Sequence, residues 1–486
     1  MEAPALVLHL GAWSVGKGAL QHKLSRALMR SIKEGAIAPG IRLPSERTLA
    51  QALTVSRTTV VAAYDALREA GWLESRPGSR TRVAASSAVV QAARGSAHAA
   101  ALASSPLLGM LSQREESGII DFALGAPHTL PGLSADLLTL PPDDYAALLR
   151  DRLYYPLGLP LLRQAIAAEI TAEGLPSTAG QILVTNGAQQ AISLCAALCL
   201  QRGDTALIED PSYFGALDVF RATGARLAPL PLGRHGVVPA VLRERCIASA
   251  ARLIYLTAAC QNPTGIVMPS AARREIARTV AALNVPLIDD RTLAGLVLDG
   301  PDLPPLAAFA PAAGIFTVGS ISKLIWPGLR VGWVRAPEPS IERLARLKSA
   351  SDLGSPLLTQ AVAARLLTSV SEARRLRRAQ LLPRRDRLAA LLRRLLPSWS
   401  FQLPAGGLFL WVELPAGDSR EFAQLALRHG VAVIPGPAMS ATESSTRRLR
   451  IPFFWEAETL VEGVRRLAAA WREYQPAESS VRTVLV

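Results

Sequence analysis

Five short polar motifs occur in the middle of the 486-residue chain, and each follows a short apolar run. Together they supply an amine, carboxylates, an amide, hydroxyls, an aromatic ring and a glycine turn. A glycine turn that opens a helix suits a phosphate, and an aromatic ring can stack on a flat ligand. In chain order the motifs are Thr185-Asn186-Gly187-Ala188-Gln189-Gln190, Glu209-Asp210-Pro211-Ser212-Tyr213, Gln261-Asn262-Pro263-Thr264-Gly265, Asp289-Asp290 and Ser320-Ile321-Ser322-Lys323, with Arg330 seven residues after the lysine.

These are the groups that pyridoxal 5'-phosphate requires. A lysine amine must form an imine with the cofactor's aldehyde, and a carboxylate must keep the pyridine nitrogen protonated so that the ring can accept electrons. Taken alone, Lys323 would be an ordinary surface lysine. The four other motifs, in their order, favour the cofactor site.

Six apolar segments are expected to be the buried strands that position these motifs. Their apolar character is continuous rather than alternating, and helical stretches lie between them, which favours a mainly parallel α/β sheet covered on both faces. Ligands in such sheets bind beyond the carboxyl ends of the strands, where the polar motifs fall. The segments are residues 182–185, 206–209, 253–257, 286–289, 316–319 and 331–334.

The motifs TNGAQQAI, EDPSYFGA, QNPTG, LIDD and VGSISKLIWPGLRVGW, in this order, resemble those of fold-type I aminotransferases. The resemblance covers residues 116–475 and implies a large α/β domain with a small C-terminal α+β subdomain. It also implies that Lys323 forms the imine, that Asp289 pairs with the pyridine nitrogen, that Asn262 donates to the phenolic oxygen and that Tyr213 lies against the ring. The groups implied to hold the phosphate are the amides of Ala188 and Gln189 together with Ser320, Ser322 and Arg330.

The same resemblance assigns a ligand-binding role near the C-terminus. In Arg450-Ile451-Pro452-Phe453, the arginine matches the one that grips a substrate carboxylate in these enzymes. A guanidinium fork is suited to such bidentate contact. Arg447 and Arg448 are equally cationic neighbours, so the alternative is that Arg450 is one of a structural cluster.

Two departures from the family pattern bear on activity. The segment Asp289-Asp290-Arg291-Thr292 lacks the tyrosine that usually follows the carboxylate and hydrogen-bonds the phenolic oxygen, which argues against full transamination efficiency. The family's tyrosine that reaches the phosphate of the other subunit stands near a Pro-x-Gly turn. Here either Tyr154 or Tyr155, just before Pro156-Leu157-Gly158, represents it.

The first 84 residues have the pattern of a winged helix-turn-helix. Apolar residues at every fourth position predict a helix from Leu20 to Ile32, Pro44-Ser45 opens a short second helix, and Ser56 is a good N-cap for a third. A two-stranded hairpin is expected over residues 72–83. The third helix would enter the major groove of DNA, and the expected contacts are Ser56, Arg57, Thr58 and Thr59 on that helix, with Arg47, Arg80 and Arg82 at phosphates or the minor groove.

The stretch PGIRLPSERTLAQALTVSRTTVVAAYDALREAGWLESRPGSRTRV resembles the DNA-binding domain of the GntR family almost throughout. At Arg80 the family's wing usually has a second glycine, so a stiffer and more basic hairpin tip is expected here. The alternative is a three-helix interaction module with a solvated basic face. The charge alone would permit that module, and the motif disfavours it.

Composition divides the chain and excludes several classes of protein. Apolar residues make up 50% and charged residues 19%, so neither a disordered chain nor a collagen-like fibre fits. The net charge of +14 points to polyanions or anionic ligands, and 12 basic against 6 acidic residues place +6 of it up to residue 84. We expect a DNA-binding domain over residues 1–84, an Ala/Ser-rich linker over 85–115, an effector domain over 116–475 and a tail over 476–486.

The four cysteines lack the paired spacing of a zinc site and are too few for a disulfide framework. We therefore expect reduced, buried thiols and no metal. No segment approaches the roughly 18 uninterrupted apolar residues that a membrane span needs, and no signal peptide is recognised, so a cytoplasmic protein is expected.

Nine arginines are concentrated between residues 372 and 394. A polybasic helix here could touch DNA, but the favoured interpretation is a solvated face on an amphipathic helix that packs the small subdomain. The arginines are Arg374, Arg375, Arg377, Arg378, Arg384, Arg385, Arg387, Arg393 and Arg394.

A GntR-type domain joined to an aminotransferase-like domain is the arrangement of the MocR family of regulators, also called the GabR type, which the chain resembles. The resemblance implies a homodimeric transcription factor that binds an operator in double-stranded DNA. Its effector would be an amine or amino acid that exchanges onto the imine at Lys323 and recruits Arg450. Two alternatives stay open: an active aminotransferase with a DNA-tethering domain, or a regulator whose signal is the cofactor itself.

Overall fold

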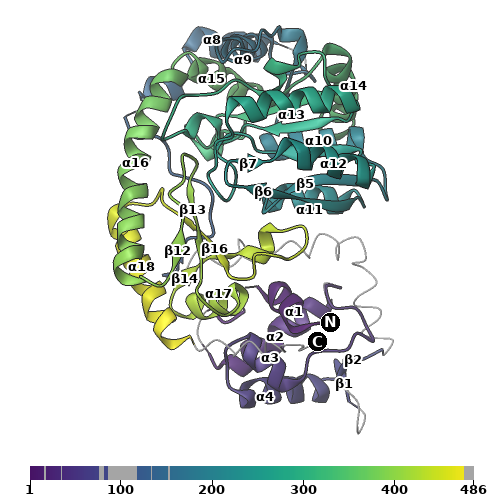
Figure 1. Ribbon diagram of the computed structural model, residues 1–486, viewed down its shortest axis with the longest axis vertical. Helices are drawn as coiled ribbons and strands as arrows, with labels where there is room; N and C mark the ends of the chain where they lie inside the picture. Colours follow the sequence, from purple (N-terminus) through teal and green to yellow (C-terminus); the bar gives the residue numbers. More distant parts are fainter. Residues whose placement is uncertain are drawn as a thin grey trace.

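The computed structural model describes residues 1–11, 13–15, 18–33, 35–75, 81–85, 118–132, 134–151 and 154–474. These residues form a DNA-binding head, a large domain and a small domain (Figure 1). The head and the large domain lie at opposite ends of the molecule, with the small domain between them. The expected linker beyond residue 85 and the tail after residue 475 lie outside the described residues.

The head is a helix-turn-helix with a hairpin, as predicted. Ser45 and Ser56 cap α3 and α4, because each hydroxyl accepts a hydrogen bond from the amide three residues later, at 3.2 Å. β1 and β2 pair antiparallel. Arg80 lies outside the described residues. The elements of the head are α1 (Ala3–Leu10), α2 (Leu20–Lys33), α3 (Glu46–Ala52), α4 (Arg57–Glu69), β1 (Leu73–Glu74) and β2 (Arg82–Val83).

Helix α1 was not expected from the sequence. Its apolar residues Leu6 and Leu10 are fully buried in the same core as Leu24 and Leu28 of α2. The helix packs on α2 and α3 on one side and on the small domain on the other. It therefore belongs to the head and also borders the rest of the molecule.

The large domain is built on an eight-stranded sheet in the order β4-β11-β10-β9-β8-β5-β6-β7. The central neighbours β10, β9, β8, β5 and β6 run parallel, β11 is antiparallel to both β10 and β4, and β7 is antiparallel to β6. The mainly parallel sheet predicted from the apolar runs is thus present. Its strands are β4 (Ile182–Thr185), β5 (Thr205–Asp210), β6 (Arg226–Gly233), β7 (Gly236–Val237), β8 (Leu253–Leu256), β9 (Leu287–Asp290), β10 (Ile315–Ser320) and β11 (Gly332–Arg335).

Both faces of this sheet are covered by helices, which explains its continuous apolar runs. Alternate strand residues enter two different buried clusters. Leu183, Ile208 and Ile288 pack with α10 (Ala188–Cys199), α11 (Phe214–Ala222) and α14 (Glu338–Asp352). Leu207, Leu256 and Leu287 pack with α12 (Pro239–Ser249), α13 (Ser270–Leu283), α9 (Pro160–Ala172) and α15 (Leu357–Leu367).

The small domain packs a four-stranded sheet, ordered β12-β13-β16-β15, against two helices. A short additional pair joins β14 to β3, so the first described residues after the head are anchored to this domain. The elements are β3 (Ile120–Asp121), β12 (Ser400–Phe401), β13 (Phe409–Glu413), α17 (Ser419–Arg428), β14 (Val431–Ala432), β15 (Ile434–Pro435), β16 (Arg448–Pro452) and α18 (Ala457–Glu473). The helix α8 (Pro142–Arg150) lies at the far end of the large domain (Figure 1).

Helix α16 (Val370–Leu395) runs along the large and small domains and carries the nine arginines. Arg377 is buried and donates to the carbonyl oxygens of Leu324 and Ile325 at 2.9 and 3.2 Å. Arg385 is also buried and donates to the Pro404 carbonyl at 3.0 Å. Several of these arginines therefore hold the fold together, while Arg378, Arg387, Arg393 and Arg394 are exposed.

Three further observations concern the described part of the chain alone. None of its helices combines the length and the apolar character that a bilayer crossing would need. All four cysteines are free, and Cys195, Cys246 and Cys260 are buried. Within the same residues, no group of three or more His, Cys, Asp or Glu side chains could hold a metal ion.

Candidate cofactor pocket and DNA-reading face

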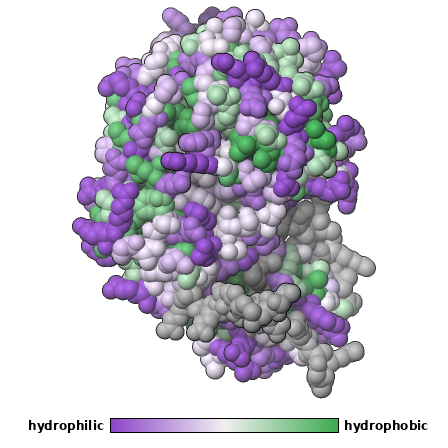
Figure 2. All heavy atoms as spheres, in the orientation of Figure 1, coloured by the Kyte–Doolittle hydropathy of each residue, from purple (hydrophilic) through white to green (hydrophobic). Residues whose placement is uncertain are grey.

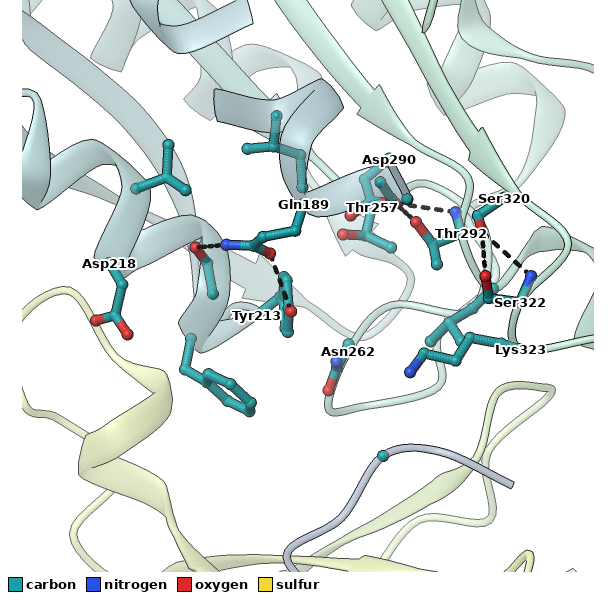
Figure 3. A pocket seen from close by; sticks show the side chains of 18 of the residues that line it. Gln189, Tyr213, Asp218, Thr257, Asn262, Asp290, Thr292, Ser320, Ser322 and Lys323 are labelled. Atoms are coloured by element: carbon teal, nitrogen blue, oxygen red, sulfur yellow. Dashed lines mark hydrogen bonds between the residues drawn. The ribbon is translucent and has the colours of Figure 1, made fainter. Parts of the chain in front are cut away.

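A cavity of about 870 Å³ lies at the carboxyl ends of the central strands, between the large and small domains. Its walls bring together residues from all five polar motifs (Figure 3). The predicted site residues that line it are Ala188, Gln189, Tyr213, Asn262, Ser320, Ser322, Lys323, Arg330 and Arg450.

Lys323 follows β10 and extends into this cavity on the side of Asn262 (Figure 3). Its amine has no hydrogen-bond or ion-pair partner among the described residues. Burial, reinforced by the charges of Arg330 and Arg450, lowers the pKa of Lys323 to about 8. A larger fraction of this amine is therefore neutral and nucleophilic at physiological pH than for an ordinary lysine.

The start of α10 forms one wall. Gly187 has φ +83°, and a Cβ there would come within 2.8 Å of the Arg330 guanidinium, so only glycine fits this turn. The backbone amides at the start of the helix and Arg330 thus border the same part of the cavity. On the neighbouring loop the hydroxyls of Ser320 and Ser322 are 3.0 Å apart. This combination of amides, guanidinium and hydroxyls is suited to a phosphate.

Tyr213 is held in place by the side chain of Gln189. The tyrosine hydroxyl donates to Gln189 Oε1 at 3.1 Å, and Gln189 Nε2 donates to the Gly215 carbonyl at 2.8 Å. Burial, which is the main cause, raises the pKa of Tyr213 to about 12, so its hydroxyl stays protonated. The ring is thus a fixed, neutral surface on the cavity wall.

The two neighbouring acids at the end of β9 face opposite sides of the sheet, as successive strand residues must. Asp289 is fully buried away from the cavity, and its Oδ2 accepts a hydrogen bond from the Leu306 amide at 2.9 Å. Asp290 lines the cavity instead. The position of Asp289 therefore does not support the role predicted for it, and the geometry transfers that expectation to Asp290.

Three donors fix the carboxylate of Asp290. The buried hydroxyl of Tyr255 donates to Oδ2 at 2.6 Å, while the amide and hydroxyl of Thr292 donate to Oδ1 at 2.9 and 2.5 Å. Hydrogen bonds from three donors to both oxygens restrict the rotation of this carboxylate. Neither Tyr255 nor Thr292 was predicted to take part in the site.

Arg450 enters the cavity from β16 of the small domain. Its guanidinium carbon is 4.0 Å from the ring centroid of Phe409 and 5.5 Å from that of Phe214. It donates to the Ala123 carbonyl at 2.6 Å, its Nε has no partner, and no acid pairs with it among the described residues. Burial lowers its pKa to about 9. A buried guanidinium without an acid is poised for an anionic ligand.

Glu209 lies behind the cavity wall. Its Oε2 accepts hydrogen bonds from the Thr257 amide at 3.0 Å and from Gln261 Nε2 at 3.4 Å, whereas Oε1 has no partner among the described residues. Complete burial is the main cause that raises the pKa of Glu209 to about 8. This side chain is therefore mostly neutral at pH 7.

The tyrosines considered for a partner's phosphate lie outside the cavity. The Tyr154 side chain is 72% exposed, and the hydroxyl of Tyr155 donates to Asp151 at 2.6 Å. Neither lines the described cavity. Of the two, Tyr154 is the one available to a second molecule.

The expected DNA contacts in the described part of the head lie on exposed surfaces of α3, α4 and β2. Arg47, Arg57 and Thr58 are exposed, whereas Thr59 is half-buried and Ser56 is bonded to both neighbouring threonine hydroxyls. Arg82 on β2 pairs with Glu74 at 3.1 Å. Helix α4 faces away from the large domain, and hydrophilic side chains gather over it (Figures 1 and 2).

Comparisons with known proteins match both parts of this arrangement. Residues 20–83 match the family described as bacterial regulatory proteins, gntR family, and residues 147–467 match aminotransferase class I and II. The chain is 32% identical to an uncharacterized HTH-type transcriptional regulator, YisV of Bacillus subtilis, over 88% of this chain and 91% of that one. It is 30% identical to the probable rhizopine catabolism regulatory protein MocR of Rhizobium meliloti, over 78% of each chain. The chain belongs to the MocR family.

This MocR-type chain is also similar to enzymes. It is 32% identical to 2-aminoadipate transaminase of Thermus thermophilus, over 74% of this chain and 92% of the enzyme. The solved structure of LysN, the alpha-aminoadipate aminotransferase of the same species, superposes with a TM-score of 0.67 at 31% identity and covers 73% of this chain and 92% of that one. That structure contains N-(5'-phosphopyridoxyl)-L-leucine. The class I aminotransferase fold is that of pyridoxal phosphate-dependent proteins.

Several residues of the cavity in this MocR-type chain were not predicted. Phe214 directly follows the predicted Tyr213, so its proximity was a signal that could have been used. Phe409 and the segment from Ala123 to Ala126 come from distant parts of the chain and carry no local motif. Only the packing of the small domain against the large one brings them to the site.

Proposed function

We propose that this regulator binds pyridoxal 5'-phosphate at Lys323 and changes its affinity for operator DNA when an amine or amino acid enters the same cavity. The observation that carries the proposal is that Lys323 and Arg450 face one cavity, and that neither has an acidic partner among the described residues. Two cationic side chains that line one cavity without counterions favour ligands that carry an aldehyde or an anionic group.

The residues of the cavity fit the cofactor. The start of α10, Arg330, Ser320 and Ser322 would hold its phosphate. Asp290 would pair with its pyridine nitrogen and Asn262 with its phenolic oxygen. When bound, pyridoxal phosphate supplies an aldehyde that condenses with amines and a ring that withdraws electrons.

The chain's own groups would then select the effector. The low pKa of Lys323 keeps part of its amine unprotonated and able to exchange with another amine. Arg450 would bind a carboxylate of the effector, and the two phenylalanine rings near its guanidinium would keep water away. The favoured effector is therefore an amine that also carries a carboxylate.

For a ligand to regulate DNA binding, it must bind two arrangements of the molecule with different affinity. Lys323 belongs to the large domain and Arg450 to the small domain, so a ligand that contacts both would stabilise one relative position of the domains. This difference in free energy is what the head would respond to.

A homodimer is part of the proposal. Large apolar side chains are exposed at one end of the large domain, where Gly354 is in contact with the backbone of Tyr154 and α9 packs on α15. A second copy of the chain covering this surface would bury them and place Tyr154 in the dimer contact. Sedimentation velocity should show a dimer that Leu149→Asp shifts toward monomer. These side chains are Tyr145, Leu149, Tyr154, Leu161, Leu353 and Leu358.

The first experiment is the absorption spectrum of the purified protein with added pyridoxal phosphate. Lys323→Ala should abolish the visible band that arises when the cofactor condenses with an amine, while the control Lys33→Ala in the head should leave it unchanged. Because the pKa of Lys323 is about 8, formation of the band should accelerate as the pH rises through 8 and then level off. An unchanged spectrum in Lys323→Ala would refute the proposed site.

A second candidate function is an aminotransferase that carries a DNA-binding domain. The similarity to 2-aminoadipate transaminase over 92% of that enzyme favours it. The segment Asp289-Asp290-Arg291-Thr292 lacks the tyrosine that usually follows the carboxylate in these enzymes, which argues against it. Multiple turnovers with an amino acid and 2-oxoglutarate would favour the enzyme. DNA affinity that changes with pyridoxal phosphate and does not change further with any amine or amino acid would instead make the cofactor the signal.

A further inference from the structure

The head is in contact with the small domain through two of its helices. Helices α1 and α3 both pack on α17 (Figure 1). Helix α1 lies outside residues 20–83, the part that matches the GntR family, so part of this contact comes from an element that the match does not include.

One side chain makes the polar contact. Arg428, the last residue of α17, donates to the carbonyl oxygens of Leu53 and Thr54 at 2.8 and 2.7 Å and to the Thr54 hydroxyl at 2.6 Å. These carbonyls end α3, where helical partners are missing, and they begin the turn to the DNA-reading helix. The guanidinium therefore caps the turn of the helix-turn-helix from outside the head.

The contact falls on a strained part of the turn's backbone. Thr54 has φ +54°, a left-handed conformation that is unfavourable for a β-branched side chain. Two of its oxygen atoms accept hydrogen bonds from Arg428. The structure thus uses a residue that is poorly suited to the turn and stabilises it by an arginine of another domain.

The same part of the small domain is also connected to the wall of the cavity. One oxygen of Asp210, Oδ2, accepts three hydrogen bonds from this region. The donors are the hydroxyls of Ser440, Thr442 and Ser444, at 3.0, 3.0 and 3.3 Å. Asp210 ends β5 and precedes Tyr213 of the cavity wall by three residues.

The loop of residues 440–444 also reaches toward the head. Glu443 pairs with Arg420 of α17 at 3.3 Å, and its charge acts on His9 of α1. One continuous set of contacts therefore runs from the cavity wall through this loop and α17 to the head.

The docked head keeps its DNA-reading side chains available. Arg47, Arg57 and Thr58 remain exposed, and the Arg57 side chain is 69% exposed. The turn that Arg428 holds ends directly before Ser56, the N-cap of the DNA-reading helix. A change at this contact would therefore alter how α4 is presented without covering it.

We infer that α17 and the 440–444 loop form the surface that holds the chain's own DNA-binding head, with Arg428 as its principal polar contact. This surface is also the connection through which ligand binding in the cavity reaches the head. The docking part stands on the contacts alone, whereas the regulatory part rests on the proposed function.

Docking is tested by hydrogen exchange in the full-length protein. Arg428→Ala should make the amides of residues 53–56 and of α1 exchange at least about tenfold faster, because hydrogen bonds to a charged group are lost. The matched control is Arg465→Ala, an arginine of the neighbouring α18 that pairs with Glu462 and does not contact the head. Equal exchange in wild type and Arg428→Ala would overturn the docking surface.

The occupant is tested by cross-linking. Cysteines placed by Thr54→Cys and Arg428→Cys should be joined within one chain by a short thiol-reactive cross-linker. Mass spectrometry should then show a monomer that carries one linker attached at both positions, and a monomer without this link would count against the contact. The single variants are the controls, since the chain's own cysteines are mostly buried. A covalent dimer instead would show that the head of a second copy occupies the surface, and would overturn the assignment to the chain's own head.

The connection is tested by DNA affinity with pyridoxal phosphate as the probe, on a DNA fragment selected from a random pool. Saturating cofactor should change the affinity of wild type by at least about fivefold. Arg428→Ala, and separately the pair Thr442→Val with Ser444→Ala, should reduce this change to less than twofold while the cofactor's absorption stays normal. Arg465→Ala should keep it.

The outcomes separate the two ideas. If wild type shows no cofactor absorption, the proposed function fails, and hydrogen exchange still decides the docking surface. If the absorption is normal but Arg428→Ala responds like wild type, the connection is wrong and the proposed function stands. A normal absorption with no change in DNA affinity of wild type would also overturn the connection.

Discussion

The head and the cavity both present arginines to anionic partners, but they do so in opposite environments. The side chain of Arg57 is 69% exposed and lies 3.5 Å from Glu46. Arg450 is 1% exposed, lies against two aromatic rings and has no acid beside it among the described residues. An exposed charge acts over about a Debye length and is weakened by salt, whereas a buried charge acts on a group beside it and is screened much less.

This difference in burial explains how one chain can bind two kinds of anion. The exposed arginines suit a polyanion whose many phosphates release counterions, and this binding depends steeply on salt. The buried arginine suits one carboxylate of defined position, with little dependence on salt. The affinity of the head for DNA should therefore depend mainly on ionic strength. The affinity of the cavity for its ligand should depend mainly on whether the ligand places a carboxylate at Arg450.

The largest effect is expected at the acid that faces the cavity. Asp290→Asn removes the negative charge opposite the proposed pyridine nitrogen, so affinity for pyridoxal phosphate should fall about 100-fold, as when one partner of a buried charge pair is removed. Asp289→Asn is the control and should change the affinity by less than about threefold. Titration of the absorption band measures both, and a larger loss for Asp289→Asn would restore the assignment made from the sequence.

A large effect on stability is expected at Glu209. Folding raises the pKa of this acid to about 8, so the folded state binds its proton more tightly than the unfolded state. The resulting contribution to stability is fully present below the pKa of the unfolded chain and is lost as the pH rises toward 8. Between pH 5 and 8, the free energy of unfolding of wild type should therefore fall by up to about 3 kcal/mol more than that of Glu209→Gln. Urea unfolding at both pH values measures the difference. Parallel pH dependence in the two proteins would show that Glu209 does not titrate in this range.

A conservative substitution sharpens the contrast within the cavity. Arg450→Lys keeps the positive charge but loses the fork and the stacking on Phe214 and Phe409, so preference for amino acids over the corresponding decarboxylated amines should fall about tenfold. Competition in the absorption assay measures it for matched pairs of ligands. If the preference survives in Arg450→Lys, the guanidinium is structural.

The corresponding change in the head should have a smaller effect. Arg57→Lys keeps a phosphate-binding charge on an exposed helix, so affinity for random DNA should change by less than about threefold, whereas Arg57→Ala should lower the slope against log salt by about one. Fluorescence anisotropy between low and high salt measures both slopes. An unchanged slope in Arg57→Ala would exclude contact of this side chain with DNA.

The smallest effect is expected on α16. Arg387 is exposed on a helix that packs the two domains of the effector region, away from the head. Arg387→Ala should leave DNA affinity within about 1.5-fold of wild type at every salt concentration, since a solvated charge far from the duplex is screened. A loss as large as that of Arg57→Ala would show that the arginine-rich helix touches DNA.

Much of the fold could be predicted because its signals are local. Ser45 and Ser56 stand directly before the helices they cap, and each polar motif ends the strand that carries it. The side of the sheet on which Asp289 lies could not be predicted, because successive strand residues face opposite sides and a shift of one position is invisible in the sequence. Helix α1 was missed because its short apolar run shows no clear helical period in the sequence. Only the structure shows that α17 and the rest of the head cover it.

The part of the site that could not be predicted depends on contacts between domains. Phe409 approaches Arg450 only because β13 and β16 pair. Arg428 contacts Thr54 although the two residues are 374 positions apart in the sequence. No local pattern records which carbonyl a distant arginine will reach.

Helix α16 contacts the backbone close to both cations of the cavity, and Pro383 lies between the two contacts. Before Pro383, Arg377 bonds the backbone directly after Lys323; after it, Arg384 bonds the backbone close behind Arg450. Proline supplies no amide to the helix, so bending costs least at this point. Bending the helix at Pro383 would move the small domain relative to the large domain. The distance between the Lys323 amine and the Arg450 guanidinium would then change, while the backbone contacts of Arg377 and Arg384 stayed intact.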